Sequence, residues 1–255
     1  MTFLSTIRRL KEMEIQSLPI SGTIENSKRH FVQSLRSAHP SLIAEVKPHS
    51  PSKGKVISLE QVPSVVDRYN RHAQAISVLC DQKYFGGGYD LLSSVRAMTD
   101  LPILAKEFII DERQISAARR AQADAVLLIA ALNEPELNQS LAEKALELGM
   151  GILFEIHTPE ELSLVPSIGP THMAIGINSR NLQTMEIDLG TIKTIAPLIR
   201  ERFPDHLIIG ESGISSAADI DTLQSSVDGF LIGSVLLNKN ATARSIFEFF
   251  PAARS

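Results

Sequence analysis

The sequence has little of what would indicate secretion or membrane attachment. It contains one cysteine in 255 residues, Cys80, which cannot form an intramolecular disulfide. This cysteine follows a largely apolar run, 75–79, which predicts a buried structural thiol and fits a reducing, cytoplasmic location. The longest uninterrupted apolar run, 125–132, is far too short to span a bilayer, so no membrane interaction is expected.

Signatures of nucleic-acid, dinucleotide and metal binding are equally scarce. The formal net charge is −4, and no basic stripe is available to neutralise phosphates, which argues against a nucleic-acid partner. The glycine run 86–88 lacks the G-x-G-x-x-G spacing of a dinucleotide site and predicts a tight loop presenting Phe85. The seven histidines show no metal-ligand spacing. We therefore expect neither a metal nor an organic cofactor.

The chain is instead rich in short apolar runs that alternate with helix-like patterns. With 44% hydrophobic and 21% charged residues, the composition is that of a globular protein. The expected strands are 42–47, 75–79, 103–106, 125–129, 152–156, 174–177, 207–210 and 230–232. The expected helices are 59–72, 89–98, 112–121, 136–148, 160–165, 189–200, 217–224 and 241–250. Fully apolar strands alternating with helices form parallel sheets, and eight repeats predict a closed (β/α)₈ TIM barrel of the α/β class.

The repeats occupy most of the chain, and no linker divides it. Barrels of this kind fill about 250 residues as one domain, so we expect a single domain over residues 1–255, with the barrel at 41–250. Residues 1–40 precede the first strand, with Leu4, Ile7 and Leu10 at roughly helical spacing. They predict an N-terminal helical extension lying across one end of the barrel.

Polar residues end most of the expected strands, where TIM barrels carry their chemistry. These residues are Glu45 and Lys47, Lys106 and Glu107, Glu155, Asn178 and Arg180, and Glu211 and Ser212. Lysines and glutamates around one cavity push their pKa values apart toward the working pH, which suits general acid-base catalysis. A lysine could alternatively form a Schiff base with a carbonyl substrate, and residue types alone leave both chemistries open.

Two Gly-Ser elements predict a phosphate site. Ser212-Gly213 follows the seventh expected strand, and Gly233-Ser234 follows the eighth. Glycine lets the backbone approach the anion, serine adds a hydroxyl donor, and the N-terminus of a short extra helix would supply N–H groups. We therefore expect a small phosphorylated substrate.

Eight motifs in order resemble those of the indole-3-glycerol-phosphate synthase family, over roughly residues 31–237. They are LIAEVKPHSPSKG (42–54), ISVLCDQKYFGGGYD (76–90), LPILAKEFIID (101–111), ADAVLLIAAL (123–132), LFEIH (153–157), IGINSRNL (175–182), GESGI (210–214) and FLIGSVLL (230–237). The resemblance implies a carboxy-lyase of tryptophan biosynthesis. Such an enzyme converts 1-(2-carboxyphenylamino)-1-deoxyribulose 5-phosphate into indole-3-glycerol phosphate, losing carbon dioxide and water. It is expected to act as a monomer or weak homodimer.

The resemblance also implies a role for each matching residue. Lys106 would be the general acid on the substrate ketone, and Glu155 would transfer a proton during dehydration. Glu45 and Lys47 would complete the acid-base set, to which Asn178 and Glu211 are added as catalytic residues. The substrate-binding residues would be Asn178 and Arg180 for orientation, Ser50 near the anionic groups, Ser212, Gly213, Gly233 and Ser234 at the phosphate, and Phe85, Phe108, Leu127 and Leu182 around the anthranilate ring.

The chain departs from the family pattern at several positions near the site. Pro48-His49 stands where a basic residue usually follows the first-strand lysine, Glu107 replaces the usual aspartate, and Cys80 replaces Thr or Ser. The segment before the first strand is also diverged. Because none of these changes removes a residue with an implied catalytic role, we expect them to affect substrate fit more than the reaction class.

Two alternative functions remain. Another phosphate-binding barrel, such as phosphoribosylanthranilate isomerase, would share the phosphate cradle but needs a Cys/Asp acid-base pair. A non-catalytic barrel scaffold would need none of the polar residues at the strand ends.

Overall fold

Eight parallel strands form a closed barrel in the computed structural model, which describes residues 3–18, 23–50, 54–238 and 240–250. The barrel strands are β1 (Ser41–Val46), β4 (Ala75–Leu79), β5 (Ile103–Lys106), β6 (Ala125–Ile129), β7 (Gly151–Ile156), β8 (Met173–Asn178), β9 (Ile208–Glu211) and β10 (Gly229–Ile232). They pair in chain order, and β10 closes the barrel against β1. The predicted TIM barrel is confirmed.

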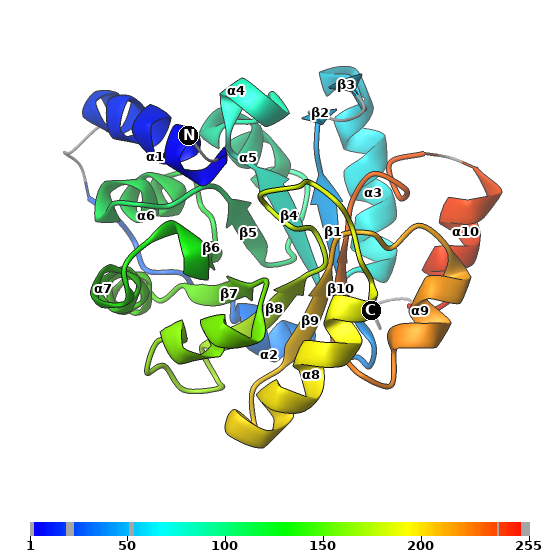
Figure 1. Ribbon diagram of the computed structural model, residues 1–255. Coiled ribbons are helices and arrows are strands. Elements are labelled where there is room, and N and C mark those ends of the chain that lie inside the picture. Colours follow the sequence, from blue (N-terminus) through cyan, green and yellow to red (C-terminus); the bar gives the residue numbers. More distant parts are fainter. Residues whose placement is uncertain (1–2, 19–22, 51–53, 239, 251–255) are drawn as a thin grey trace.

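Helices surround the barrel (Figure 1). Those after the strands are α3 (Val62–His72), α4 (Gln82–Phe85), α5 (Tyr89–Arg96), α6 (Glu112–Arg120), α7 (Pro135–Glu147), α8 (Gly190–Arg202), α9 (Ala217–Leu223) and α10 (Ala241–Phe247). Short 3₁₀ helices are η1 (Ile15–Ser17), η2 (Leu59–Gln61), η3 (Ala130–Leu132) and η4 (Pro159–Leu164), and β2 (His49–Ser50) pairs with β3 (Gly54–Lys55) as a hairpin. Among the described residues, no helix is long and apolar enough to cross a membrane.

The expected helices differ from the observed ones in three places. The segment expected as a helix at 160–165 is the 3₁₀ helix η4, because prolines at 159 and 166 bound a stretch of only six residues. Residues 59–61 form η2 rather than the first turn of α3, since Pro63 starts the α-helix anew. Phe85 was expected in a loop but ends helix α4, which Asp81 caps through the backbone N–H of Tyr84 at 2.6 Å.

Strand burial explains why the barrel closes. Every residue of β1, β4, β6, β7 and β8 is buried, so these strands need apolar partners on both faces. Alternate residues of each strand point into the barrel, where Ile43, Leu104 and Leu153 belong to an interior core. The residues between them point outward, and Leu42 and Phe154 pack there against the helices. The inward positions at the carboxyl ends of the strands are therefore the ones that can carry a site.

The N-terminal extension contributes to both ends of the barrel, whereas it was expected to cross one end. Helix α2 (Phe31–Leu35) buries Phe31, Val32 and Leu35 in the core of the barrel interior, at the amino ends of the strands. Helix α1 (Phe3–Glu14) instead lies near α4 and α6 (Figure 1), and Arg8 donates to the carbonyl of Leu132 at 2.9 Å. Residues 1–2 and 19–22 of the expected extension, 51–53 of the first motif, and 239 and 251–255 lie outside the described residues.

Candidate active site

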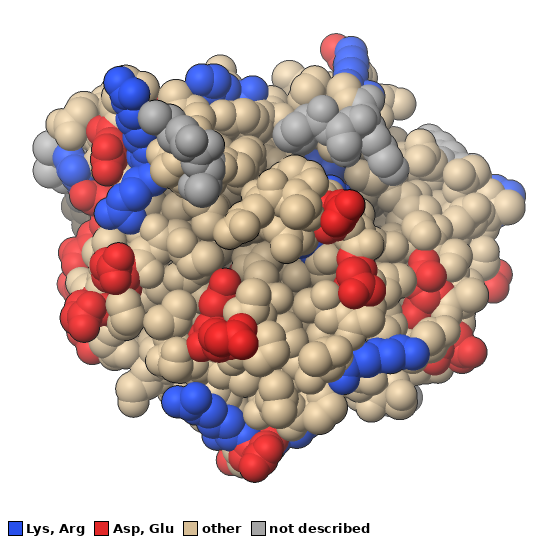
Figure 2. All heavy atoms as spheres, viewed as in Figure 1, with Lys and Arg blue, Asp and Glu red and all other residues tan. Residues whose placement is uncertain are grey.

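A cavity of about 330 Å³ opens at the carboxyl ends of the barrel strands. All the residues expected at the site line it: Glu45, Lys47, Ser50, Phe85, Lys106, Phe108, Leu127, Glu155, Asn178, Arg180, Leu182, Glu211, Ser212, Gly213, Gly233 and Ser234. They converge because they lie near the carboxyl ends of the parallel barrel strands or in the segments that follow these strands. On the face in Figure 2, the acidic and basic side chains of the described residues are intermixed, and acidic side chains lie beside the central hollow.

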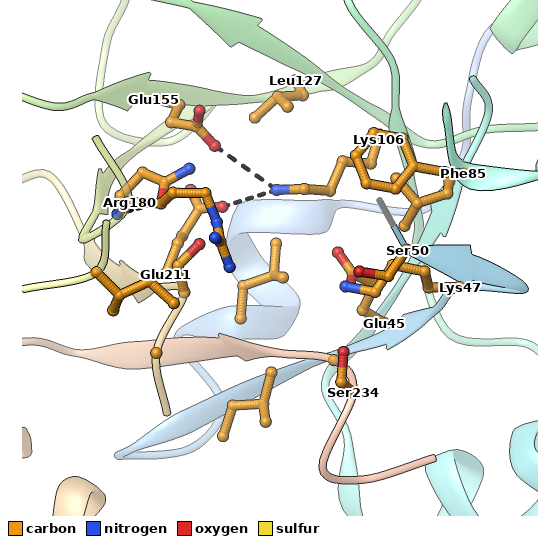
Figure 3. A pocket seen from close by; sticks show the side chains of 18 of the residues that line it. Glu45, Lys47, Ser50, Phe85, Lys106, Leu127, Glu155, Arg180, Glu211 and Ser234 are labelled. Carbon is orange, nitrogen blue, oxygen red and sulfur yellow. Dashed lines mark hydrogen bonds and ion pairs between the residues drawn. The ribbon is translucent and has the colours of Figure 1, made fainter. Parts of the chain in front are cut away.

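Lys106 is the centre of the charge arrangement. Its Nζ donates to Glu211 Oε2 at 2.9 Å and lies 3.6 Å from Glu155 Oε2, as the dashed lines in Figure 3 show. Burial disfavours the ammonium, but Glu211, Glu155 and Glu45 outweigh burial and raise the pKa of Lys106 above its ordinary value. Lys106 is therefore protonated at neutral pH and able to donate a proton into the cavity.

Three of the carboxylates that line the cavity have different protonation tendencies. Burial raises the pKa of Glu211 to about 7, against the pull of Lys106 and with help from the nearby Glu155 carboxylate. Burial also opposes the ionised form of Glu155, yet Lys106 and His157 lower its pKa overall. Glu45 follows the same pattern, because Lys47, whose Nζ lies 2.5 Å from its Oε1, lowers its pKa despite full burial. The site therefore combines carboxylates that stay ionised with one that exchanges protons near neutrality.

Two glycines make room for these carboxylates. A Cβ at Gly176 on β8 would lie 2.1 Å from Glu211 Oε1, and a Cβ at Gly233 would lie 2.3 Å from Glu45 Oε1. Neither glycine is needed for its backbone conformation, since neither has positive φ. Both positions are inward-facing, so a larger residue there would push a carboxylate out of place.

The Gly-Ser elements form two adjacent loops at the cavity mouth. Ser212 and Gly213 follow β9 with φ of 64° and 80°, a left-handed conformation that is unusual for serine and marks a constrained turn. Gly233 and Ser234 follow β10, and Leu236 N–H donates to the Gly233 carbonyl at 2.9 Å, which closes a turn. The short extra helix expected here is not found among the described residues of the segment, because this turn leads directly to α10.

An apolar wall faces the charged residues. It includes Phe85 and Phe108, whose ring centroids lie 6.4 Å apart, together with Leu127 and Leu182. A flat aromatic ring can pack on this wall while a polar portion of the same molecule reaches Lys106.

Sequence reasoning missed a lysine that ties helix α1 to the site. Lys11 is almost fully buried, and its Nζ lies 2.8 Å from each of Glu14, Asp81 and Glu107. Asp81 caps α4, and Glu107 lines the cavity next to Lys106. The only signal in the sequence was a lysine at the spacing of the buried positions of α1, where an apolar residue would be expected.

Apolar residues at the cavity mouth were also missed. Phe3 of α1 lines the cavity and makes edge-on ring contacts with Tyr84 and Phe108. Met185 and Ile187 line it from the loop after β8, where an isolated bridge pairs Arg180 with Ile187. Contacts of this kind depend on how distant loops meet, and no local pattern in the sequence announces them.

The model of one protein family, indole-3-glycerol phosphate synthase, matches residues 4–249. The chain belongs to the indole-3-glycerol phosphate synthase family. An indole-3-glycerol phosphate synthase from Lachnospira eligens is 36% identical, over 95% of this chain and 90% of that protein. One from Kineococcus radiotolerans is 38% identical, over 83% of this chain and 76% of that protein.

Longer relatives also match this member of the indole-3-glycerol phosphate synthase family. A tryptophan biosynthesis protein TrpCF from Vibrio parahaemolyticus is 41% identical over 83% of the chain, which spans only 44% of that relative's length. Among solved structures, a 3-hexulose-6-phosphate synthase superposes with a TM-score of 0.62 at 14% identity, covering 82% of this chain and 99% of that one. At that identity the structural likeness supports the barrel fold alone.

Proposed function

We propose that the chain is an indole-3-glycerol-phosphate synthase, a carboxy-lyase of tryptophan biosynthesis. The observation that carries the proposal is the buried Lys106 ammonium between Glu155 and Glu211, in a cavity that also holds an apolar wall and two Gly-Ser loops. Its substrate is 1-(2-carboxyphenylamino)-1-deoxyribulose 5-phosphate. The chain works as a single domain in the cytoplasm, as a monomer or weak homodimer.

The chemistry uses general acids and bases at each stage. The ring carbon that bears the carboxylate attacks the ketone carbon, and the carbonyl electron pair takes a proton from Lys106 to give an alcohol. The carboxylate leaves as carbon dioxide, and its bonding pair restores the aromatic ring. The hydroxyl then leaves as water with a second proton, while the carbon next to nitrogen releases one proton. Each turnover therefore consumes one proton from solution.

The remaining residues divide between proton transfer and binding. Glu155 serves the proton transfers of dehydration, and Glu211, bonded to Lys106 at 2.9 Å, returns a proton to the lysine between turnovers. The Lys47–Glu45 pair completes the acid-base set. Asn178 and Arg180 orient the substrate with Ser50. Ser212, Gly213, Gly233 and Ser234 hold the phosphate, and Phe85, Phe108, Leu127 and Leu182 hold the anthranilate ring.

No cofactor is proposed, because the electron pair released on decarboxylation is absorbed by the forming indole. Extensive chelation should accordingly leave turnover unchanged. Loss of activity on chelation, with recovery on adding one divalent metal, would contradict this part of the proposal.

The isomerase alternative lacks a suitable cysteine. Cys80 packs in the core between barrel and helices, does not line the cavity, and burial raises the pKa of its thiol well above the ordinary value. A thiol so placed is neither accessible nor reactive. No observation favours the scaffold alternative, since a scaffold has no need of buried, paired charges.

The deciding experiment follows indole fluorescence after the purified protein is mixed with the arylamino-deoxyribulose phosphate. We expect steady product formation, and no turnover of phosphoribosylanthranilate in a parallel reaction. Absence of an indole signal at high enzyme concentration would overturn the proposed function.

A further inference from the structure

His157 faces the carboxylate oxygen of Glu155 that does not face Lys106. It follows β7 immediately, its side chain is 8% exposed, and it does not line the cavity. Its Nε2 lies 3.3 Å from Glu155 Oε1, and its Nδ1 lies 3.5 Å from Glu161 Oε2. The imidazole thus stands between a carboxylate of the site and a carboxylate of η4.

Glu161 fixes the imidazole from behind. The Oε2 that faces the ring also accepts the backbone N–H of His157 at 2.7 Å, so the carboxylate is held to the same turn. Both ring nitrogens are buried without a hydrogen bond of ordinary geometry, and a neutral ring would turn the lone pair of one nitrogen toward a carboxylate oxygen. As an imidazolium, both N–H groups face carboxylates, which is the favourable arrangement.

Glu155 is consequently held by two cations, one facing each of its carboxylate oxygens. Its Oε1 faces His157 and its Oε2 faces Lys106, while the Asn178 side chain adds a hydrogen bond. When Lys106 gives its proton away, one of these cations is lost. A buried carboxylate left beside neutral Lys106 alone would take up a proton, because burial favours its neutral form.

We propose that His157 is a positioning residue, a permanent cation held by Glu161, which orients Glu155 and keeps it ionised while Lys106 cycles between charged and neutral forms. The proposal rests on the proposed function, because it assigns His157 to the proton transfers of that reaction. His157 touches no reacting atom and acts only through Glu155.

The charges around His157 agree with a permanent cation. Burial lowers the pKa of the imidazole, but Glu155 and Glu161 outweigh burial and raise it to about 10. Glu155 in turn is paired with Lys106 on β5, which is paired with Glu211 on β9. A histidine in this environment stays protonated across the neutral range and is no proton shuttle at pH 7.

The test compares pH profiles of kcat for three variants. His157→Gln keeps a hydrogen-bond donor and removes the positive charge. The pKa of Glu155 should therefore rise, and the acid side of the kcat profile should shift to higher pH by about one pH unit or more. KM should change by less than about twofold, because His157 does not touch substrate. Glu161→Gln should instead lower the pKa of His157. The kcat profile of this variant should then fall on the alkaline side, because His157 loses its proton within the measured pH range. Glu160→Gln removes a carboxylate from the exposed side of the same turn and should leave the profile unchanged.

A second measurement does not depend on turnover. In ¹H–¹⁵N spectra of the imidazoles, the signal of His157 is the one that is absent from His157→Gln. In the wild-type protein this signal should be that of a charged ring from pH 6 to about pH 9. A titration near the ordinary value of about 6.5 would overturn the proposal. Kinetic profiles of His157→Gln and wild type that coincide after scaling would also overturn it, because a merely structural residue lowers activity equally at every pH. If wild type forms no indole product, the proposed function fails while the spectra still decide the charge of His157.

Discussion

Replacing Lys106 with methionine tests the assignment of the general acid. Methionine keeps most of the chain length and apolar volume and removes the ammonium that lies 2.9 Å from Glu211 and 3.6 Å from Glu155. Loss of a positioned general acid lowers the rate about 10²- to 10⁴-fold, or about 2.7 to 5.4 kcal/mol in the barrier. We expect kcat to fall by at least this range, with phosphate binding retained because the Gly-Ser loops are untouched.

The same change should make stability depend more strongly on pH. Removing one partner of a buried ion pair costs about 3–5 kcal/mol when the other partner stays charged. In wild type, burial raises the folded pKa of Glu211 to about 7 against the pull of Lys106, so removal of Lys106 raises this pKa further and Glu211 can escape part of the penalty by taking up a proton. Because its folded pKa is raised, the linked stability is present at low pH and lost as the pH rises through the folded pKa of Glu211. Lys106→Met should therefore unfold at a lower temperature at pH 8 than at pH 6, and the difference should exceed that of wild type.

The assay is single-turnover formation of the fluorescent indole product, with KM measured alongside. Lys106→Arg is the matched control, because arginine keeps the positive charge for Glu211 and Glu155 but surrenders its proton far less readily. Low kcat in both variants supports proton donation by Lys106. Wild-type turnover in the arginine variant would assign Lys106 an electrostatic role alone, and near wild-type turnover in the methionine variant would move the acid to Lys47.

Three further predictions concern neighbouring residues. Gly233→Ala should lower kcat as well as raise KM, because the new Cβ would lie 2.3 Å from Glu45 Oε1 and displace this carboxylate. A rise in KM alone would show that only phosphate binding was disturbed. Wild-type kcat/KM should show a limb near pH 7 that disappears in Glu211→Gln, since burial raises the pKa of Glu211 to about 7; persistence of the limb would assign it to another group. Lys11→Met should lower the free energy of unfolding, measured in urea, by about 3–5 kcal/mol at pH 8 and by less at pH 5. Burial raises the pKa of Glu107 to about 6, so at pH 5 this carboxyl takes up a proton and its unpaired charge is removed. An equal loss of stability at both pH values would contradict this reasoning.

Local sequence patterns predicted the architecture and many of the residues that line the cavity. The strands predicted at 75–79, 103–106 and 125–129 coincide with β4, β5 and β6, because strands buried on both faces require largely apolar sequence. The polar residues that end these runs had to meet at one mouth once the barrel closed, since all strands run parallel. Residues as distant as Glu45 and Ser234 could therefore be assigned to one cavity from the sequence.

Only the tertiary structure decided which charged groups pair and how each is held. Whether Glu155 faces Lys106 alone or also His157 depends on side-chain direction beyond the end of β7, which no periodicity specifies. The partners of Lys11 come from three segments, and the two helices of the N-terminal extension separate to opposite ends of the barrel. Contacts between distant segments form only when the whole chain closes. The sequence therefore supplied the groups of the site, and closure of the barrel set their distances, their burial and hence their pKa values.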